Sequence, residues 1–250
     1  MTTTKDALST RMKEQYENRS RYYLPRRTYS IIRADGKSFH TWTKGFKRPY
    51  DESLMSAFDY TALRMCEEIQ GAQFAFVQSD EISILLTDFE NPTTSAWFDG
   101  NIQKSASVSA SLATGFFNAW FKNEVRGDHE GYPVAFFDSR IFVIPDAIEV
   151  ENYFIWRQKD TTSNSISMAA QSVYGHKELH GKSGSDMQEM LFKKGINWNN
   201  YPTSFKRGRV CAYENQKWGF PEVPIFTQDK AFLKKLIPLH WANDAVVAHS

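Results

Sequence analysis

The sequence predicts a mixed α/β (α+β) fold, an antiparallel sheet with helices packed on it. Segments with strand and helix patterns follow one another in the order strand, helix, strand, strand, helix, strand. Across 250 residues, 41% are hydrophobic and 24% charged, which is typical of a globular chain that buries a sizeable core. Acidic residues stand where the first strand ends and where the third begins.

The first strand and helix are well delimited. Residues 1–20 form a polar helical lead-in, and the β-branched run at 29–33 predicts a short strand. Asp51 is placed to cap a helix over 51–70, because apolar residues recur there every three or four positions. Gly71 is expected to end that helix.

Two strands at 74–77 and 82–86 flank a polar turn, which predicts a hairpin. A helix over 101–122 is rich in Ser, Ala and Gly, so we expect it to pack closely against the sheet. Another strand is predicted at 141–144.

Asp146 is expected to cap the next helix, and separate helices are predicted over 164–174 and 185–194. The end of the chain, which contains Pro221, Pro224 and Pro238, is predicted to be irregular. The element order is that of a ferredoxin-like split βαβ unit, the architecture of polymerase palms and nucleotide cyclases. One domain, 1–250, is expected, with a core over about 25–160 and a helical and irregular extension over about 161–250.

Charge is balanced overall and uneven locally. Lys and Arg number 30 against 29 Asp and Glu, which argues against a generally basic coat. Residues 11–48 nevertheless hold eleven basic and three acidic residues, residues 193–209 hold five basic residues and no acidic one, and residues 51–100 hold ten acidic residues and one basic residue. Basic segments beside an acidic site suit an enzyme that handles polyanions, although scattered solvated charge is an equal alternative.

Several protein classes are disfavoured. No apolar run approaches the length of a membrane span, and residues 1–10 lack the apolar region of a secretory signal. Two cysteines are too few for a disulfide framework, so we expect a cytoplasmic protein. The glycine patterns of P-loop and dinucleotide-binding proteins are missing. His176 and His180 have the spacing of a zinc pair, but a two-histidine loop is more often plain surface.

Two carboxylates are expected to meet at the sheet edge. In a split βαβ sheet the first and third strands are neighbours, so Asp35 and Asp80 would face each other. Two close carboxylates repel unless they are protonated or bridged by a cation, and Mg²⁺ is the natural bridge because it prefers oxygen ligands and brings phosphates. The alternative to a metal site is that Asp35-Gly36 is an ordinary turn and Asp80-Glu81 part of an ordinary hairpin.

The peptide after Asp35 supports a phosphate site. Gly36 allows a close backbone approach, and the stretch 37–40 would present successive N–H groups to a triphosphate. Lys44, Lys47 and Arg48 follow and could neutralise phosphate oxygens.

The chain also resembles the tRNA-His guanylyltransferase family and its guanylyltransferase-like relatives, the 3′–5′ polymerases. The resemblance rests on ordered blocks, which are Arg33-Ala-Asp-Gly-Lys-Ser-Phe-His40, Phe46-Lys-Arg-Pro-Tyr-Asp51, Gln78-Ser-Asp-Glu81, Phe137-Asp-Ser-Arg140, Tyr153-Phe-Ile-Trp-Arg-Gln-Lys-Asp160, Gly195-Ile-Asn-Trp-Asn-Asn200 and Pro238-Leu-His240.

The resemblance implies addition of nucleotides to the 5′ end of tRNA, after ATP activates that end, with GTP and other nucleotides as substrates. It implies two Mg²⁺ ions held by Asp35, Asp80 and the Gly36 carbonyl, with Glu81 supporting the metals as a third catalytic residue. It also implies a homo-oligomer, a tetramer in the family. The implied nucleotide-binding residues are Asp35, Gly36, Lys37, Ser38, Phe39, His40, Lys47, Arg48, Ser79 and Asp80.

The RNA contacts have two sources. The family resemblance implies that Arg157 and Asn164 contact tRNA. The local excess of basic residues predicts further tRNA contacts by Lys206, Arg207 and Arg209 and by the arginines from Arg19 to Arg27.

The chain departs from the eukaryotic branch of the family at two places. Thr162-Ser-Asn-Ser165 stands where that branch has His-Ile-Asn-Asn, and Met187 stands where it has a lysine. These differences favour templated repair of 5′-truncated tRNA over strict G−1 addition to tRNA-His. The alternatives are a nucleotidyl cyclase or ordinary 5′–3′ palm polymerase, and a non-catalytic RNA-binding protein.

Overall fold

The computed structural model describes residues 7–124 and 133–240. Within them an antiparallel sheet of six strands runs in the order β4-β1-β3-β2-β5-β6. The strands are β1 (Tyr29–Gly36), β2 (Ala72–Gln78), β3 (Glu81–Leu86), β4 (Phe137–Ile144), β5 (Arg209–Glu214) and β6 (Lys217–Gly219). The first four have the expected split βαβ order, with β1 and β3 side by side.

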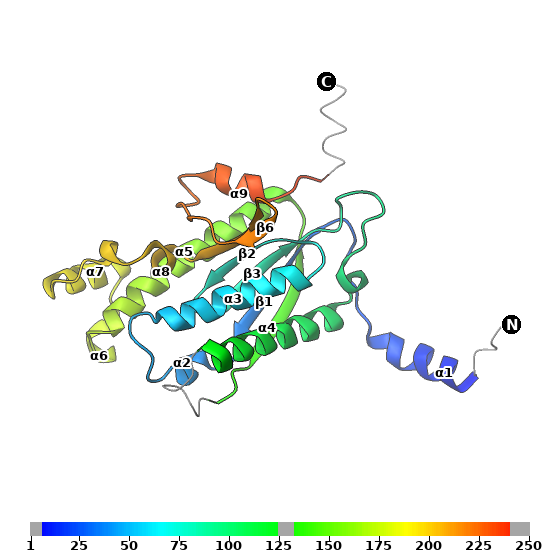
Figure 1. Ribbon diagram of the computed structural model, residues 1–250, viewed down its shortest axis with the longest axis horizontal. Helices are drawn as coiled ribbons and strands as arrows, with labels where there is room; N and C mark the ends of the chain where they lie inside the picture. Colours follow the sequence, from blue (N-terminus) through cyan, green and yellow to red (C-terminus); the bar gives the residue numbers. More distant parts are fainter. Residues whose placement is uncertain (1–6, 125–132, 241–250) are drawn as a thin grey trace, which may run out of the picture.

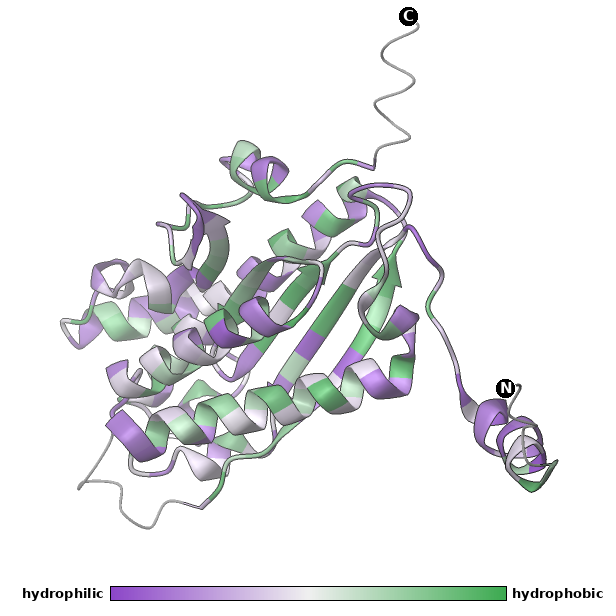
Figure 2. Ribbon diagram, turned by 45° about the vertical axis from the view of Figure 1, so that its right-hand side comes forward, coloured by the Kyte–Doolittle hydropathy of each residue, from purple (hydrophilic) through white to green (hydrophobic). Residues whose placement is uncertain are grey.

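Two helices cover one face of the sheet and a third covers the other (Figure 1). On the first face lie α3 (Glu52–Glu68) and α4 (Ile102–Glu124), which enclose one apolar core with the sheet residues Ile32, Ala34 and Ile84. On the other face, α5 (Ala147–Gln171) encloses a second core through Val150 and Phe154. Strands with apolar side chains therefore run between two helical layers, as the hydropathy colours show (Figure 2).

The caps and the small-residue helix form as the sequence predicts. The Asp51 carboxylate accepts hydrogen bonds from the amides of Ser53 and Leu54 at the start of α3. Gly71 follows α3 with φ +84°, and a Cβ there would lie 2.5 Å from the Thr87 carbonyl oxygen. In α4, Ser109 lies against β4 and donates to Ser139 Oγ at 2.7 Å.

The prediction of a separate helix over 164–174 is wrong, because α5 is continuous to Gln171. Thr161, Thr162 and Ser163 are poor helix formers, but each hydroxyl donates to the carbonyl four residues earlier. Packing of Ala169 and Ala170 against Leu191 then holds the last turns. Tertiary contacts outweigh weak local propensity here.

The chain end is more regular than predicted. β5 extends the sheet beside β2 and β6 follows it, and α9 (Lys230–Leu236) packs on the second core through Leu233. The short helices α6 (His176–Leu179) and α8 (Thr203–Arg207) and the longer α7 (Gly184–Lys193) gather beside the C-terminal half of α5 (Figure 1).

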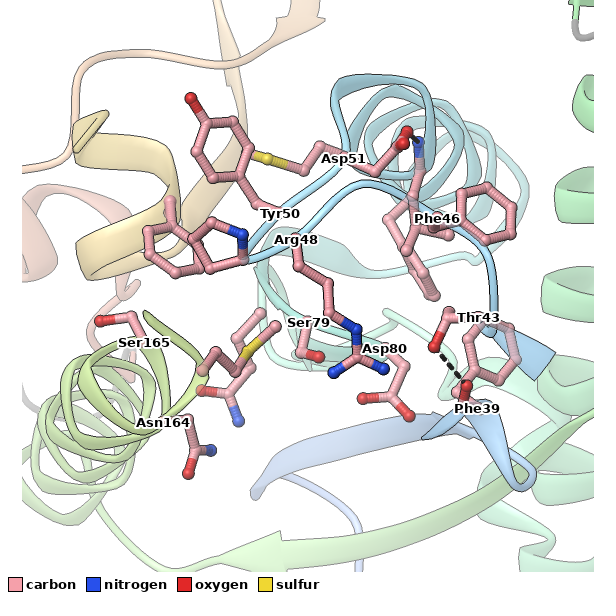
Figure 3. A pocket seen from close by; sticks show the side chains of 18 of the residues that line it. Phe39, Thr43, Phe46, Arg48, Tyr50, Asp51, Ser79, Asp80, Asn164 and Ser165 are labelled. Carbon is pink, nitrogen blue, oxygen red and sulfur yellow. Dashed lines mark hydrogen bonds between the residues drawn. The ribbon is translucent and has the colours of Figure 1, made fainter. Parts of the chain in front are cut away.

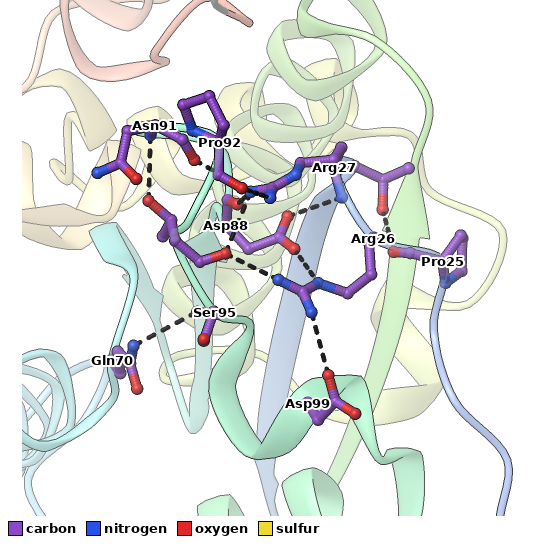
Figure 4. Close-up of polar contacts among 11 residues, drawn as sticks. Pro25, Arg26, Arg27, Gln70, Asp88, Asn91, Pro92, Ser95 and Asp99 are labelled. Carbon is purple, nitrogen blue, oxygen red and sulfur yellow. Dashed lines mark hydrogen bonds and ion pairs between the residues drawn. The ribbon is translucent and has the colours of Figure 1, made fainter.

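At the other end of the molecule, α1 (Ala7–Gln15) projects away from the sheet (Figure 1), with no buried residue. The chain that follows is tied to the segment after β3 (Figure 4). Arg26 Nε lies 2.6 Å from Asp88 Oδ2 and its Nη1 lies 3.1 Å from Asp99 Oδ1. The Arg27 guanidinium donates to the backbone carbonyls of Asp88, Asn91, Pro92 and Thr94.

Both guanidinium groups bind the protein's own chain, although the Arg26 side chain is still 39% exposed. That this arginine run contacts RNA stays a prediction.

The short 3₁₀ segments η1 (Glu17–Ser20), η2 (Trp97–Gly100) and η3 (Trp198–Asn200) and the four-residue α2 (Phe39–Trp42) complete the described elements. None of the described helices has the length and apolar character needed to cross a membrane.

Candidate active site

Asp35 and Asp80 are brought together by the ends of three strands. Asp35 stands at the penultimate position of β1, and Ser79 and Asp80 form the two-residue turn between β2 and β3. The amide of Gly36 donates to the Asp80 carbonyl oxygen at 3.0 Å, which ties the end of β1 to this turn. Ser79 has φ 42°, a left-handed conformation that is uncommon outside glycine and is concentrated at functional sites.

The two carboxylates are partly buried and repel each other. Burial raises the pKa of Asp80, and the nearby charge of Asp35 raises it further. Burial also raises the pKa of Asp35, with a second contribution from Asp138, its neighbour on β4. Among the described residues, no Lys or Arg forms an ion pair with Asp35 or Asp80. Ionisation of both groups therefore creates a site that favours a cation.

The donors present fit Mg²⁺ better than a metal held wholly by protein. No group of three or more His, Cys, Asp or Glu able to hold a metal occurs in the described part of the chain. Mg²⁺ is usually bound through one or two carboxylates, with waters and substrate phosphates completing its ligands. Asp35 and Asp80 supply that number of carboxylates.

Glu81 is engaged in a different way from the two aspartates. Its Oε2 lies 2.9 Å from Arg157 Nη2 and 3.2 Å from Arg33 Nε, and Ser83 donates to its Oε1 at 3.1 Å. The side chains of Glu81 and Arg157 are only 7% and 6% exposed. Burial raises the pKa of Glu81, while the two arginines act against that rise. In this arrangement Glu81 holds two arginines on the α5 side of the sheet.

Two cavities meet at the β2–β3 turn. The first has a volume of about 420 Å³ and is formed by the segment after β1, the start of α3, and parts of α5 and α8. The second, of about 470 Å³, lies between the sheet edge and α5. Both are bordered by the residues Gln78, Ser79, Asp80, Asn164, Met168 and Gln171.

The first cavity combines an apolar wall with cationic side chains. Tyr50 and Phe205 lie with ring centroids 5.1 Å apart on its wall. Arg48 extends across it toward Ser79 and Asp80 (Figure 3). Such a cavity can take a nucleobase on the apolar side and phosphates near Arg48 and the aspartates.

Most of the predicted nucleotide-binding residues line this first cavity. They are Gly36, Ser38, Phe39, His40, Lys47, Arg48, Ser79 and Asp80. Asp35 borders the second cavity instead. Lys37 borders neither, and its amide donates to the Phe136 carbonyl at 2.8 Å, so it cannot join the predicted row of free N–H groups.

Gly36 allows the close approach of the Phe39 ring. It is the last residue of β1, and a Cβ on it would lie 2.2 Å from that ring. The ring is buried among Phe58, Phe117 and Phe137, so Phe39 anchors the loop to the core.

The predicted RNA-binding residues divide into exposed and internal groups. Arg209 is buried and ion-paired with Asp59, and Arg157 is held by Glu81 and Asp160. Arg209 borders the first cavity and Arg157 the second, and contact of either with RNA stays a prediction.

The other three predicted RNA contacts retain some exposure. Asn164 borders both cavities. Lys206 donates to the Asn199 carbonyl and lies over the Trp198 ring, and Arg207 is half-buried.

Several residues that line the first cavity lie outside the set of site residues predicted from the sequence. They are Tyr50, Met55, Ser165, Met168, Gln171 and Phe205. They come from α3, α5, α8 and the loop before α3. Tyr50 lies in the Phe46–Asp51 block that carries the resemblance, but the residue types of this set do not by themselves signal a site. Only the fold brings them beside Asp80.

An antiparallel palm sheet with paired carboxylates between two cavities defines a palm-fold nucleotidyltransferase. Residues 9–145 match the family described as tRNAHis guanylyltransferase (Thg1). The chain belongs to the tRNA-His guanylyltransferase family, and the expected resemblance is confirmed.

Relatives of known name agree with this assignment. A probable tRNA(His) guanylyltransferase of Dictyostelium discoideum is 30% identical over 202 residues, which cover 75% of this chain and 76% of that protein. The solved structure of a bacterial tRNA(His) guanylyltransferase (Thg1)-like protein in complex with ATP is 44% identical, with a TM-score of 0.87 over 93% of this chain and all of that one.

The structure of the Saccharomyces cerevisiae enzyme is 25% identical, with a TM-score of 0.71 over 88% of this chain and 98% of that one. The predicted palm fold and the prediction of a nucleotidyltransferase are both confirmed.

Proposed function

We propose that the chain adds nucleotides to the 5′ end of tRNA in the 3′-to-5′ direction, with ATP and GTP as substrates. The observation that carries the proposal is the meeting of Asp35 and Asp80 between two cavities. A transfer between two nucleotide substrates needs a site on each side of the reacting phosphate. The bacterial relatives that were solved with ATP and with GTP support the choice of nucleotides.

The proposed reaction has two steps. The 5′-phosphate of the RNA first attacks the α-phosphate of ATP, which releases pyrophosphate and leaves an adenylylated end. The 3′-hydroxyl of the incoming nucleotide then attacks the 5′-phosphate and AMP leaves. In each step, one bond to phosphorus forms and one breaks.

The residues of the chain position these groups. The apolar wall with Tyr50 and Phe205 receives a base, and Lys47 and Arg48 face the triphosphate. Asp35, Asp80 and the Gly36 carbonyl would hold two Mg²⁺ ions, which stabilise charge on the attacking and leaving oxygens. Glu81 fixes Arg157 and Arg33 beside them.

Isosteric variants test the carboxylates. Asp35→Asn or Asp80→Asn should lower nucleotide addition at least about a hundredfold, because each removes a charge that holds the cations. Glu67→Gln is the control, since its carboxylate is 37% exposed, pairs with Arg64 on the surface of α3 and borders neither cavity. It should change the rate by no more than a few-fold. Near-normal addition by Asp80→Asn at saturating Mg²⁺ would rule out the assignment.

We further propose that base pairing selects the added nucleotide, because the chain lacks the His-Ile-Asn-Asn residues and the lysine of the eukaryotic branch. Asn164 borders both cavities, whereas Met187 packs beside a small apolar cluster with no charge to offer RNA. Truncated tRNAs of several identities should be extended by the nucleotide that pairs with the facing base.

Changing that facing base should change the product. Addition of G to tRNA-His alone, opposite any base, would instead assign strict G−1 activity. A cyclic mononucleotide formed without RNA would identify a cyclase.

A further inference from the structure

The second cavity has the chemistry of an anion site. It is bordered by Arg33 and Arg157, on the side of Asp80 that lies away from the first cavity. Arg157 is about 95% buried, and its Nε atom has no hydrogen-bond partner. The Nε atom of Arg33 is within ion-pair distance of Glu81 but is not aligned for a hydrogen bond. A buried donor without a partner costs free energy. Both Nε atoms are enclosed by protein, so contact with a ligand in the cavity has to come from the other guanidinium nitrogens.

The charge of this cavity favours a phosphate only when divalent cations are bound. Four carboxylates border it with the two guanidinium groups, and they belong to Asp35, Asp80, Glu81 and Asp160. The protein groups alone are therefore net negative and disfavour a phosphate. Divalent cations at Asp35 and Asp80 would reverse that sign, so a phosphate and the cations favour each other's binding.

Trp156 adds a flat, exposed surface at the border of the same cavity. Its side chain is 51% exposed although it is a large aromatic group. The Arg157 guanidinium carbon lies 4.4 Å from the ring centroid, and Tyr153 contacts the ring edge with centroids 5.8 Å apart.

The ring is thus held from one face and one edge. Tyr153 is itself fixed by a 2.9 Å hydrogen bond to Ser83, which also donates to Glu81. About half of the Trp156 surface remains exposed at the border of the cavity, where a ligand can contact it.

We propose that the second cavity binds the phosphorylated 5′ end of the RNA, with Trp156 as the platform on which its terminal base stacks. The proposal rests on the proposed function and adds a residue and a location to it. A stacking platform suits an enzyme that reads different 5′ ends, because every base offers an aromatic face. Arg33 and Arg157 face the phosphate, and the nucleotide in the first cavity approaches it from the other side of Asp80.

The test measures RNA binding without chemistry. A 3′-labelled RNA hairpin carrying a 5′-monophosphate, and its 5′-hydroxyl counterpart, are titrated with enzyme in Mg²⁺ but without nucleoside triphosphate. Trp156→Ala should weaken binding of both RNAs about tenfold, within the range measured for loss of one stacked base. Trp156→Phe should restore most of the affinity.

Two controls separate stacking from general damage. Tyr213→Ala removes an aromatic side chain that is 57% exposed on β5, outside both cavities, and should leave RNA affinity within twofold. ATP affinity of Trp156→Ala, measured by calorimetry, should also stay within twofold, because the first cavity does not include Trp156.

Three outcomes would overturn the inference. Trp156→Ala could bind both RNAs as well as the wild type, or lose affinity for RNA and ATP equally. It could also lose only the preference for the 5′-phosphate, which would make Trp156 a support for Arg157 instead of a stacking surface. Absence of RNA binding by the wild type would instead refute the proposed function itself, and the subsite with it.

Discussion

Replacement of Glu81 by glutamine should destabilise the protein strongly. The substitution keeps the shape of the side chain and removes its charge, which leaves Arg157 buried without its main partner. Loss of one partner from a buried ion pair costs about 3–5 kcal/mol. Asp160 remains 3.1 Å from Arg157 Nη2 but is 39% exposed, so it compensates only in part. We therefore expect the lower end of that range, about 3 kcal/mol.

Thermal and urea unfolding measure this effect. For a chain of this size, about 3 kcal/mol corresponds to a fall in Tm of roughly 6–12 °C. Asp138→Asn is the matched control for stability, because it breaks a surface ion pair on β4, at the edge of the same sheet. Its cost should be about 0–1 kcal/mol.

The same variant decides between two roles for Glu81. If Glu81 positions the arginines, the Mg²⁺ concentration that gives half-maximal nucleotide addition should change less than twofold in Glu81→Gln. If the variant instead keeps its stability to within about 0.5 kcal/mol and needs about ten times more Mg²⁺, the argument from burial is refuted. Glu81 would then act as the metal-supporting residue that the sequence predicts.

Other consequences concern the aspartate site and the glycines. Burial and the Asp35 charge raise the pKa of Asp80 above its unfolded value, so the stability that its protonated form provides is present at low pH and is lost as the pH rises through the raised pKa. In EDTA, Asp80→Asn should therefore have a higher Tm than the wild type at pH 8, and the difference should shrink towards pH 4. A pH-independent difference would show that burial of the Asp80 charge is not its cause.

The Gly36→Ala substitution should cost about 1–3 kcal/mol, since its methyl group overlaps the Phe39 ring. Gly115→Ala, in the exposed middle of α4 with no atom within 4 Å of the new methyl group, should instead add about 0.5–1 kcal/mol. Equal urea midpoints for the two variants would contradict this reasoning.

Local patterns in the sequence were sufficient for much of the fold. Apolar spacing and the capping residues Asp51 and Asp146 located α3 and the start of α5, and the strand order followed from element order. The meeting of Asp35 and Asp80 could be expected because it depends only on which strands are neighbours.

What the sequence could not predict depends on distant contacts. A basic residue looks alike whether it is solvated or buried, and Arg209 is neutralised by Asp59, 150 positions earlier. β5 is a six-residue strand that pairs with β2, which lies far away in the sequence. Its local residue pattern was therefore too short to predict a strand. The walls of the two cavities combine segments whose proximity is a product of the completed fold.

The continuity of α5 has a mechanical consequence. At 1.5 Å per residue, its 25 residues make a rod of about 37 Å that begins in the core under the sheet and ends among α6, α7 and α8. The helix contains no proline or glycine, at which sharp kinks are common, and it stays continuous through the hydroxyl-to-carbonyl bonds of Thr161, Thr162 and Ser163. The turns that hold Arg157 and Asn164 and the turns that pack against α7 therefore belong to one continuous helix, so the cavities and the α7 region share a single structural support.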